Sequence, residues 1–249
     1  MPTSREIAEW LNELLDLSVI EDESCNGLQV ENEGQIQKVA FAVDACYQSY
    51  SKAVLAGAQM LVVHHGMIWG GLKAVTDHTY QNIKFLINHN LALYACHLPL
   101  DLHPVYGNNA QLADLLNLRN RQKFGTYHNV PIGFIGEVED LSLDNLREIL
   151  RRHGMKDLIL PFGPSRIRRI AVVSGGAAGE VVQAAEAGAD CYITGEPLHH
   201  VQHLARELGI HVIFAGHYET ETWGVRALMQ PVSEKFHIDT EFLELETLI

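Results

Sequence analysis

The chain has 249 residues, enough for one large domain or two compact ones, and its 47% hydrophobic and 20% charged residues are typical of a soluble globular protein. A net charge of −13 disfavours non-specific binding to nucleic acid or an anionic membrane, and no apolar run reaches the roughly 18 residues of a membrane helix. The start lacks the pattern of a secretion signal and the four cysteines form no Cys-x-x-Cys pair, so we expect a cytoplasmic protein without disulfides.

Helical and strand patterns alternate along the chain. Thr3 and Glu6 have the spacing of a capping box, so the first amphipathic helix is predicted over residues 3–17. Further helices are predicted over 47–57, 80–90, 142–154, 179–189 and 198–209. Strands are predicted over 37–44, 59–66, 91–97, 133–139, 157–164, 168–176, 190–196 and 210–217, before a final helix and strand. The alternation predicts an α/β fold with largely parallel sheets.

The sequence also contains an internal repeat. Residues 36–66 align without a gap to residues 167–197, with six identical positions. Further on, "LYACHLPLD" aligns with "IFAGHYETE", which places His97 opposite His217 and Asp101 opposite Glu221. A chance match is the alternative. We predict two similar, intertwined α/β lobes from a duplication, residues 1–125 and 126–249, with a metal site in the cleft between them.

The predicted strands end in polar residues, and ligands collect at the carboxyl ends of parallel strands. The chain also has 14 histidines, nearly as many as its 18 lysines and arginines. Five residues at these strand ends are the most ligand-like: His64, His65, Asp101, His217 and Glu221. They are enough for two ions that share a carboxylate, and two ions roughly 3.5–4 Å apart can hold a bridging hydroxide as nucleophile. Nitrogen and oxygen ligands suit zinc, manganese, iron, cobalt or nickel.

Local geometry adds three expectations. Neighbouring side chains of a strand point to opposite faces, so the chain is predicted to leave the strand at about His64, helped by Gly66. His217 and Glu221 are four residues apart and should meet on one face of a helix. Pro99 lies between His97 and Asp101, which predicts a loop there.

Each of these motifs also has an ordinary interpretation. A His-His pair is commonly a hydrogen-bonded or surface pair, and the spacing of His217 and Glu221 is common on helices. The glycine-rich residues 174–180 could bind an anion through backbone N–H groups or form a plain tight turn. A basic cluster could meet phosphates or form a solvated rim. Its members are Arg151, Arg152, Arg166, Arg168 and Arg169.

Five segments occur in a familiar order along nearly the whole chain: "NGLQV" (26–30), "VVHHG" (62–66), "HLPLD" with "GNNAQLA" (97–113), "ITGE" (193–196) and "AGHYETE" (215–221). Together they resemble the Nif-three-like family of GTP cyclohydrolase 1 type 2 homologues, in particular its short bacterial YbgI-type members. The resemblance implies a two-lobed α/β fold, a dinuclear metal centre and a homohexameric toroid.

The resemblance also implies how the ligands are shared. His64, Asp101 and Glu221 would surround one ion, while His65, His217 and the same bridging Glu221 would hold its neighbour. His97 and Glu196 are then candidates for catalytic residues that move protons.

The leading hypothesis is a dinuclear divalent-metal-dependent hydrolase whose bridging hydroxide attacks a small, nucleotide-like substrate. The alternative is a toroidal scaffold that binds nucleic acid or protein, with the metals serving structure and no turnover; the acidic net charge does not support a nucleic-acid partner. A third possibility is metal sensing or storage.

Overall fold

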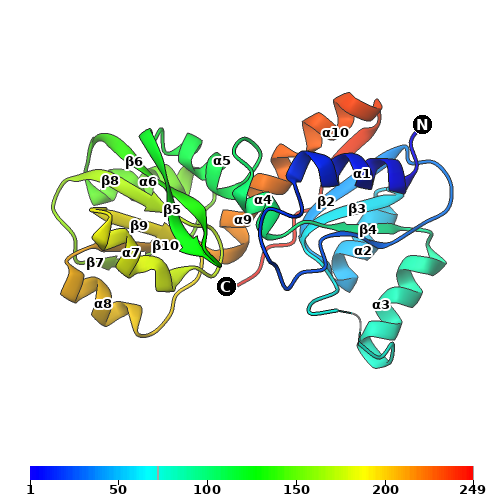
Figure 1. Ribbon diagram of the computed structural model, residues 1–249, viewed down its shortest axis with the longest axis horizontal. Coiled ribbons are helices and arrows are strands. Elements are labelled where there is room, and N and C mark those ends of the chain that lie inside the picture. The colour runs from blue at the N-terminus through cyan, green and yellow to red at the C-terminus, as the bar shows by residue number, and fades with distance from the viewer. Residues whose placement is uncertain (72, 249) are drawn as a thin grey trace. The chain divides into compact units, whose positions relative to one another are not determined.

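The computed structural model describes residues 1–71 and 73–248 and divides into two compact units. The first unit comprises Met1–Leu100 and Gly224–Leu245, and the second comprises Asp101–Trp223 with the last residues from Glu246. None of the helices in the described residues has the length and apolar character that a membrane span requires. The protein is a mixed α/β protein with one sheet in each unit (Figure 1).

The first unit is built on a five-stranded sheet in the order β1-β4-β3-β2-β11, in which only β1 runs antiparallel to its neighbour. Its strands are β1 (Gly27–Val30), β2 (Lys38–Asp44), β3 (Met60–His65), β4 (Ala92–Ala95) and β11 (Asp239–Phe242). Its helices are α1 (Ser4–Leu15), α2 (Tyr47–Leu55), α3 (Asp77–Asn88) and α10 (Met229–Phe236). In Figure 1, α1 and α10 lie on one face of the sheet and α2 and α3 on the other.

Coverage of both faces explains the apolar runs of the central strands. In β2 and β3 all residues are buried except Lys38, Asp44 and His65, as expected for parallel strands between two layers of helices. The predicted capping box of α1 is confirmed, because Thr3 Oγ1 accepts from the Glu6 amide and Glu6 Oε2 accepts from the Thr3 amide at 2.7 Å.

The second unit is built on a six-stranded sheet in the order β5-β6-β8-β9-β10-β7, with β8, β9 and β10 parallel. Its strands are β5 (Arg119–Tyr127), β6 (Val130–Leu141), β7 (Leu158–Pro161), β8 (Ile167–Val172), β9 (Cys191–Thr194) and β10 (His211–Phe214). Its helices are α5 (Asn108–Leu115), α6 (Leu143–Arg152), the short 3-10 helix η1 (Ala178–Glu180), α7 (Val181–Glu186) and α8 (Val201–Leu208). The boundary between the units falls within α4 (Leu98–Leu102) and α9 (His217–Ala227).

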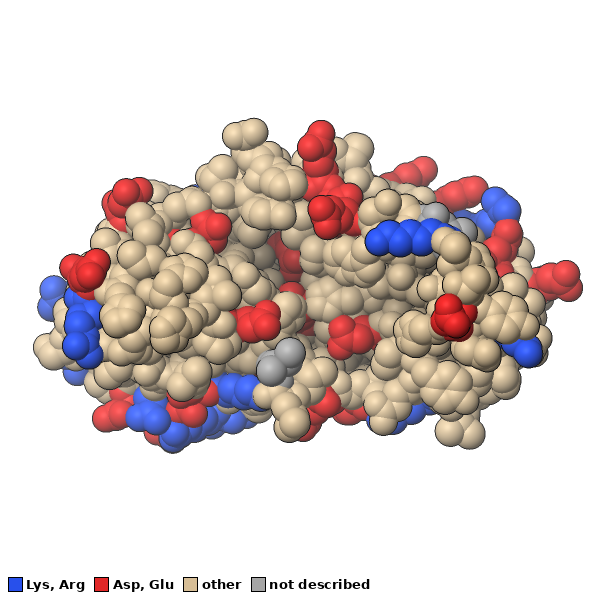
Figure 2. All heavy atoms as spheres, turned by 90° about the horizontal axis from the view of Figure 1, so that it is seen from below, with Lys and Arg blue, Asp and Glu red and all other residues tan. Residues whose placement is uncertain are grey.

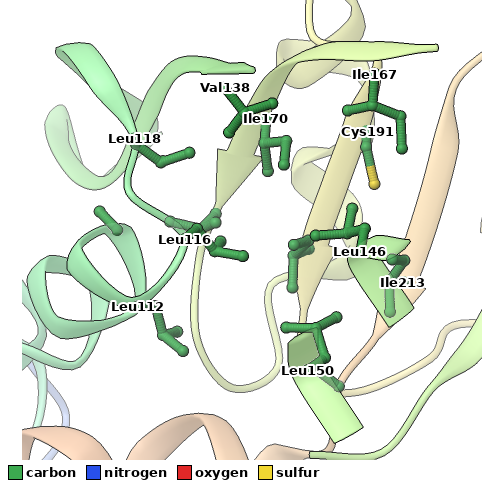
Figure 3. Packing of buried hydrophobic residues seen from close by; sticks show 14 of the residues in the cluster. Leu112, Leu116, Leu118, Val138, Leu146, Leu150, Ile167, Ile170, Cys191 and Ile213 are labelled. Atoms are coloured by element: carbon green, nitrogen blue, oxygen red, sulfur yellow. The ribbon is translucent and has the colours of Figure 1, made fainter. Parts of the chain in front are cut away.

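The core of the second unit lies between its sheet and the helices α5 and α6. Leu146 and Leu150 of α6 are fully buried and face Cys191 and Ile213 of the sheet (Figure 3). The hydrophobic spacing in the predicted helix 142–154 therefore marks the side that packs on the sheet.

The hairpin of β5 and β6 contains a strand that the sequence did not predict. Residues 119–127 are mostly exposed and carry several basic side chains, so they lack a buried alternating pattern. The two residues of the turn, His128 and Asn129, both have positive φ, 48° and 63°, which is typical of a tight two-residue hairpin.

The compact units divide differently from the predicted lobes, whose approximate boundary at 125/126 stays a prediction. The first division between the units falls at 100/101. Leu112 of α5 and Leu116, which directly follows this helix, pack in the core of the second unit. The strand β11 comes late in the chain and pairs with β2. The repeated segments 36–66 and 167–197 each contain two parallel strands joined by a helix, and the duplication itself stays a prediction.

Candidate metal centre

Imidazole side chains gather at the carboxyl ends of the strands in the first unit. His64 and His65 end β3, and His97 follows β4 by two residues. Their ring centroids are close, 4.7 Å between His64 and His65 and 5.0 Å between His64 and His97. One nitrogen from each of the three rings lies within 4.8 Å of the other two, so these residues could hold a metal ion.

Each of these imidazoles is oriented through its Nδ1 atom. Nδ1 of His64 lies 3.0 Å from the carbonyl oxygen of Cys96, and Nδ1 of His65 lies 2.8 Å from Asp44 Oδ1. Nδ1 of His97 lies 3.0 Å from Asp22 Oδ1. Carbonyl and carboxylate oxygens only accept hydrogen bonds, so each Nδ1 carries the proton and an ion would be bound through Nε2.

The strand β3 continues to His65, one residue beyond the predicted exit at His64. The adjacent rings nevertheless lie together, with His64 fully buried and His65 partly exposed. A glycine is needed at position 66 because of close packing, since a Cβ there would lie 2.3 Å from Gln29 Nε2 and 2.6 Å from Ala95 Cβ. Its backbone does not have a positive φ.

Asp22 anchors His97, and no sequence motif pointed to it. Its side chain is only 4% exposed and accepts from the Ser24 and Leu98 amides, each at 3.0 Å, and from Asn26 Nδ2 at 2.9 Å. Burial would raise the pKa of Asp22, but the hydrogen bonds from His97 and Asn26 outweigh it and hold that pKa below its usual value. The carboxylate is therefore ionised and fixed in place.

In the second unit, His217 and Glu221 lie one turn apart on α9, and the predicted contact between them is confirmed. His217 Nε2 is 3.1 Å from Glu221 Oε2, and His217 Nδ1 is 2.9 Å from Glu196 Oε2. Burial alone would lower the pKa of His217, but the two carboxylates together raise it to about 9. The Glu221 side chain is 4% exposed, so it is a buried carboxylate beside a cationic imidazole.

Gly175 lies against Glu221 in the turn after β8. It has φ +66°, and a Cβ there would lie 2.1 Å from Glu221 Oε1. Its N–H donates to Thr220 Oγ1 at 3.0 Å, and its carbonyl oxygen accepts from the amides of Gly195 and Glu196. The Gly175 amide therefore ties this turn to α9 and is not directed at an anion.

Asp101 is held in α4, where the sequence predicted a loop. That prediction was wrong. Pro99 lies in the first turn of the helix, where the backbone N–H that proline lacks would have no partner within the helix. Asp101 is 6% exposed, and its Oδ1 accepts from Asn108 Nδ2 at 2.8 Å and from Ser174 Oγ at 3.1 Å. Because Ser174 and Gly175 are consecutive, Asp101 and Glu221 both contact the turn after β8.

The basic cluster forms a rim in which four of the five arginines pair with carboxylates. All five of its arginines have polar partners in the structure: Arg151–Asp157, Arg152–Glu148, Arg166–Asp140, Arg168–Asp140 and Arg169–Gln122. Beside it lies an open depression of about 570 Å³, lined by Arg119, Arg168, Arg169, Glu137, Glu139, Asp140 and Val138. Acidic side chains offset the basic ones there, as in an ordinary solvated surface.

Of the seven predicted site residues, three belong to the first unit and four to the second. The first unit holds His64, His65 and His97, and the second holds Asp101, Glu196, His217 and Glu221. The sequence analysis assigned no supporting role to Asp22, Asp44 or Asn108. It singled out Ser174 and Gly175 only as part of a glycine-rich turn or anion site. Asp44 is the last residue of a predicted strand. The expectation that ligands collect at the carboxyl ends of parallel strands could therefore have identified it.

These features define a mixed α/β protein with two sheets and buried imidazole and carboxylate groups at the carboxyl ends of the strands. The Duf34/NIF3 (NGG1p interacting factor 3) family model matches residues 2–248, so the chain belongs to this family.

Relatives of similar length agree with this assignment. The chain is 43% identical over 242 residues to a GTP cyclohydrolase 1 type 2 homolog of Archaeoglobus fulgidus, covering 97% of this chain and 98% of the relative. It is 45% identical over 247 residues to one of Pyrococcus horikoshii, with the same coverage of each chain. The solved structure of protein ybgI, described as of unknown function, matches with a TM-score of 0.92 at 34% identity and covers 100% of both chains.

Proposed function

We propose that this protein is a dinuclear divalent-metal-dependent hydrolase that acts on a small, nucleotide-like substrate. One observation carries the proposal: His64, His65, His97 and His217 all have Nδ1 hydrogen-bonded to an oxygen. Metal-ligating histidines nearly always donate their second ring nitrogen in this way, which fixes the tautomer and makes the ligand more basic.

The nitrogen and oxygen donors of the five ligand-like residues support a proposal of two ions. His64, Asp101 and Glu221 would hold one ion, and His65, His217 and Glu221 would hold the other. Asp101 Oδ1 accepts from Asn108 and Ser174, which holds this carboxylate in place. Nitrogen and oxygen donors suit zinc, manganese, iron, cobalt or nickel.

Two ions bound together supply a hydroxide nucleophile at neutral pH and stabilise charge that develops on the substrate. Glu196 orients His217 through Nδ1, and its partly exposed carboxylate is the candidate for moving a proton to or from the substrate. His97, with its side chain 20% exposed, is the second candidate for this role. The names of the relatives favour a nucleotide-like substrate.

The test is a metal and turnover measurement on Glu221→Ala. Because Glu221 would bridge the ions, we expect this variant to lose the second ion, most of its affinity for the first and all hydrolysis in a panel of nucleotides and phosphoesters. Glu207→Ala, which alters an exposed carboxylate on α8, serves as the matched control. Two stoichiometric ions retained in purified Glu221→Ala would contradict the assignment.

We further propose that the chain assembles as a homohexameric ring, which light scattering after gel filtration tests directly through the mass of the particle. The surface charges favour a small-molecule partner over nucleic acid. On the face drawn in Figure 2, acidic and basic side chains are interspersed. Four of the five arginines of the rim are paired with carboxylates. Phosphate-backbone recognition uses a continuous basic surface.

A further inference from the structure

We infer that Trp69 is a stacking platform for the base of the substrate, and that this base is a purine. The inference deepens the proposed function and rests on it for the nucleotide-like character of the substrate. Stacking on Trp69 needs no metal ion, because the platform is formed by residues of the first unit. Trp69 is thereby a specificity-determining residue, and its role is separate from that of any metal ligand.

Trp69 lies close to imidazoles at the carboxyl ends of β3 and β4. Its ring centroid is 5.0 Å from that of His97, with the two rings inclined at 70°, and 6.2 Å from that of His65. Ligands of parallel sheets collect at this edge, so a molecule bound there would meet the indole. Trp69 is 38% exposed, which leaves part of a large aromatic surface open to such a ligand.

The indole is fixed before any ligand arrives. Its Nε1–H donates to the carbonyl oxygen of Gly66 at 2.8 Å. The backbone on both sides is also held. The Met67 amide donates to Gln29 Oε1 at 2.8 Å, and beyond the indole the Gly70 amide donates to the carbonyl oxygen of Glu23 at 2.7 Å. A side chain that is already ordered loses little conformational entropy when a ligand packs on it.

The residues after Trp69 leave room beside its ring. They are Gly70 and Gly71, and a Cβ built at either position would have no described atom of another residue within 4 Å. Two consecutive residues without side chains, next to an open aromatic surface, allow a flat ring to approach that surface. The platform therefore suits a planar ligand.

The chemistry of the platform favours a base over a phosphate or a sugar hydroxyl. Because the indole N–H already donates to Gly66, the ring offers a π-face and no free hydrogen-bond donor. Base–aromatic stacking uses such a face. A purine has two fused rings and covers the indole more fully than a pyrimidine does. A purine is therefore the base that this platform fits best.

The test compares ligands that differ in the base alone. GMP, UMP and ribose 5-phosphate are titrated into the full-length chain, both as purified and after treatment with a chelator. Binding is followed by calorimetry and by tryptophan fluorescence, corrected for absorption by the base. Trp10 and Trp223 also fluoresce, so the difference between the wild-type chain and Trp69→Phe identifies the signal of Trp69. We expect GMP to quench this signal, UMP to bind more weakly, and ribose 5-phosphate to leave it unchanged.

Two substitutions separate stacking from packing. Trp69→Phe keeps an aromatic face and should weaken GMP binding by no more than about 5-fold. Trp69→Leu keeps apolar bulk without that face and should weaken GMP binding by about 10- to 100-fold. Neither should change the affinity for ribose 5-phosphate. Tyr80→Ala alters an exposed aromatic residue of α3 and is the control, which should bind GMP like the wild-type chain.

Three results would overturn the inference: no GMP binding by the wild-type chain, unchanged GMP affinity in folded Trp69→Leu, or equal weakening of GMP and ribose 5-phosphate binding in that variant. Equal affinities for GMP and UMP would overturn the choice of a purine. If circular dichroism shows that Trp69→Leu is unfolded, the difference signal decides, and a Trp69 signal that GMP leaves unchanged would refute the platform.

These outcomes are distinct from those of the proposed function. GMP that quenches Trp69 in a chain that holds no pair of ions and hydrolyses no nucleotide would contradict the hydrolase and leave the platform standing. A chain that holds two ions and hydrolyses a purine nucleotide, with the same KM in Trp69→Leu as in the wild type, would refute the platform and leave the hydrolase standing.

Discussion

Asp44 and His65 lie directly opposite each other on the neighbouring strands β2 and β3, and Asp44 Oδ1 is 2.8 Å from His65 Nδ1. The register of two parallel strands therefore sets the tautomer of one candidate ligand. Because the carboxylate receives the Nδ1 proton, the imidazole presents Nε2 to an ion.

Replacing Asp44 with asparagine should weaken the binding of one ion by about 10- to 100-fold, since the partner of a ligating histidine tunes its basicity and orientation. Competitive titration with a chromogenic chelator measures this. Glu33→Gln, an exposed carboxylate of the same unit, should bind both ions as tightly as the wild-type chain. Equal affinities for Asp44→Asn and wild type would show that Asp44 does not tune a ligand.

Gly175→Ala should displace Glu221 and reduce metal affinity, because the added Cβ would lie 2.1 Å from Glu221 Oε1. Gly188→Ala separates this clash from backbone strain: Gly188 has a similar φ, +77°, but nothing within 4 Å of its Cβ position. Both variants should be destabilised by about 1 kcal/mol through their positive φ. Only Gly175→Ala should lose bound metal, and equal loss in both variants would refute the role given to Gly175.

The stability of the metal-free protein should fall at alkaline pH because of His217. Its pKa of about 9 in the folded chain exceeds the value of about 6.5 expected when unfolded, so folding favours the protonated form. The resulting stabilisation, at most about 3 kcal/mol, is fully present below pH ~6.5 and is lost as the pH rises through about 9. Urea unfolding of chelator-treated protein between pH 6 and 9.5 measures it. The free energy of unfolding of His217→Gln should not show this decline with pH. Parallel pH profiles for the variant and the wild-type chain would contradict the role given to His217.

Leu146→Ala should lower the free energy of unfolding by about 2–5 kcal/mol, because Leu146 is fully buried between α6 and the second sheet. Leu158→Ala is the matched control, since Leu158 is 57% exposed and its loss should cost less than about 0.5 kcal/mol. Urea denaturation at neutral pH compares the two. Similar costs for both variants would mean that this core does not stabilise the unit.

Much of the fold could be predicted because buried parallel strands and amphipathic helices leave strong periodic patterns. The apolar runs 37–44 and 59–66 are β2 and β3, and the helix predicted over 142–154 is α6. The strand β5 was missed because it is polar on most of its surface. The helix α4 was missed because Pro99 suggests a loop, although a proline fits the first turn of a helix.

The candidate site was predictable where its residues end a strand, as His64 and His65 do, or begin the helix that follows one, as His217 does. Glu221 follows His217 by one helical turn. Asp22 belongs to no motif and is brought to His97 only by tertiary folding, 75 residues along the chain. Sequence spacing gave no signal for such a contact. The position of the unit boundary depends likewise on where α5 packs and β11 pairs.

The most direct test of the dinuclear centre is anomalous X-ray diffraction from crystals grown with zinc, recorded on both sides of the zinc absorption edge. We expect two peaks per chain, roughly 3.5–4 Å apart, with nitrogen or oxygen atoms of His64, His65, Asp101, His217 and Glu221 at about 2.0–2.2 Å. A single peak, or peaks that Glu221 does not reach, would contradict it.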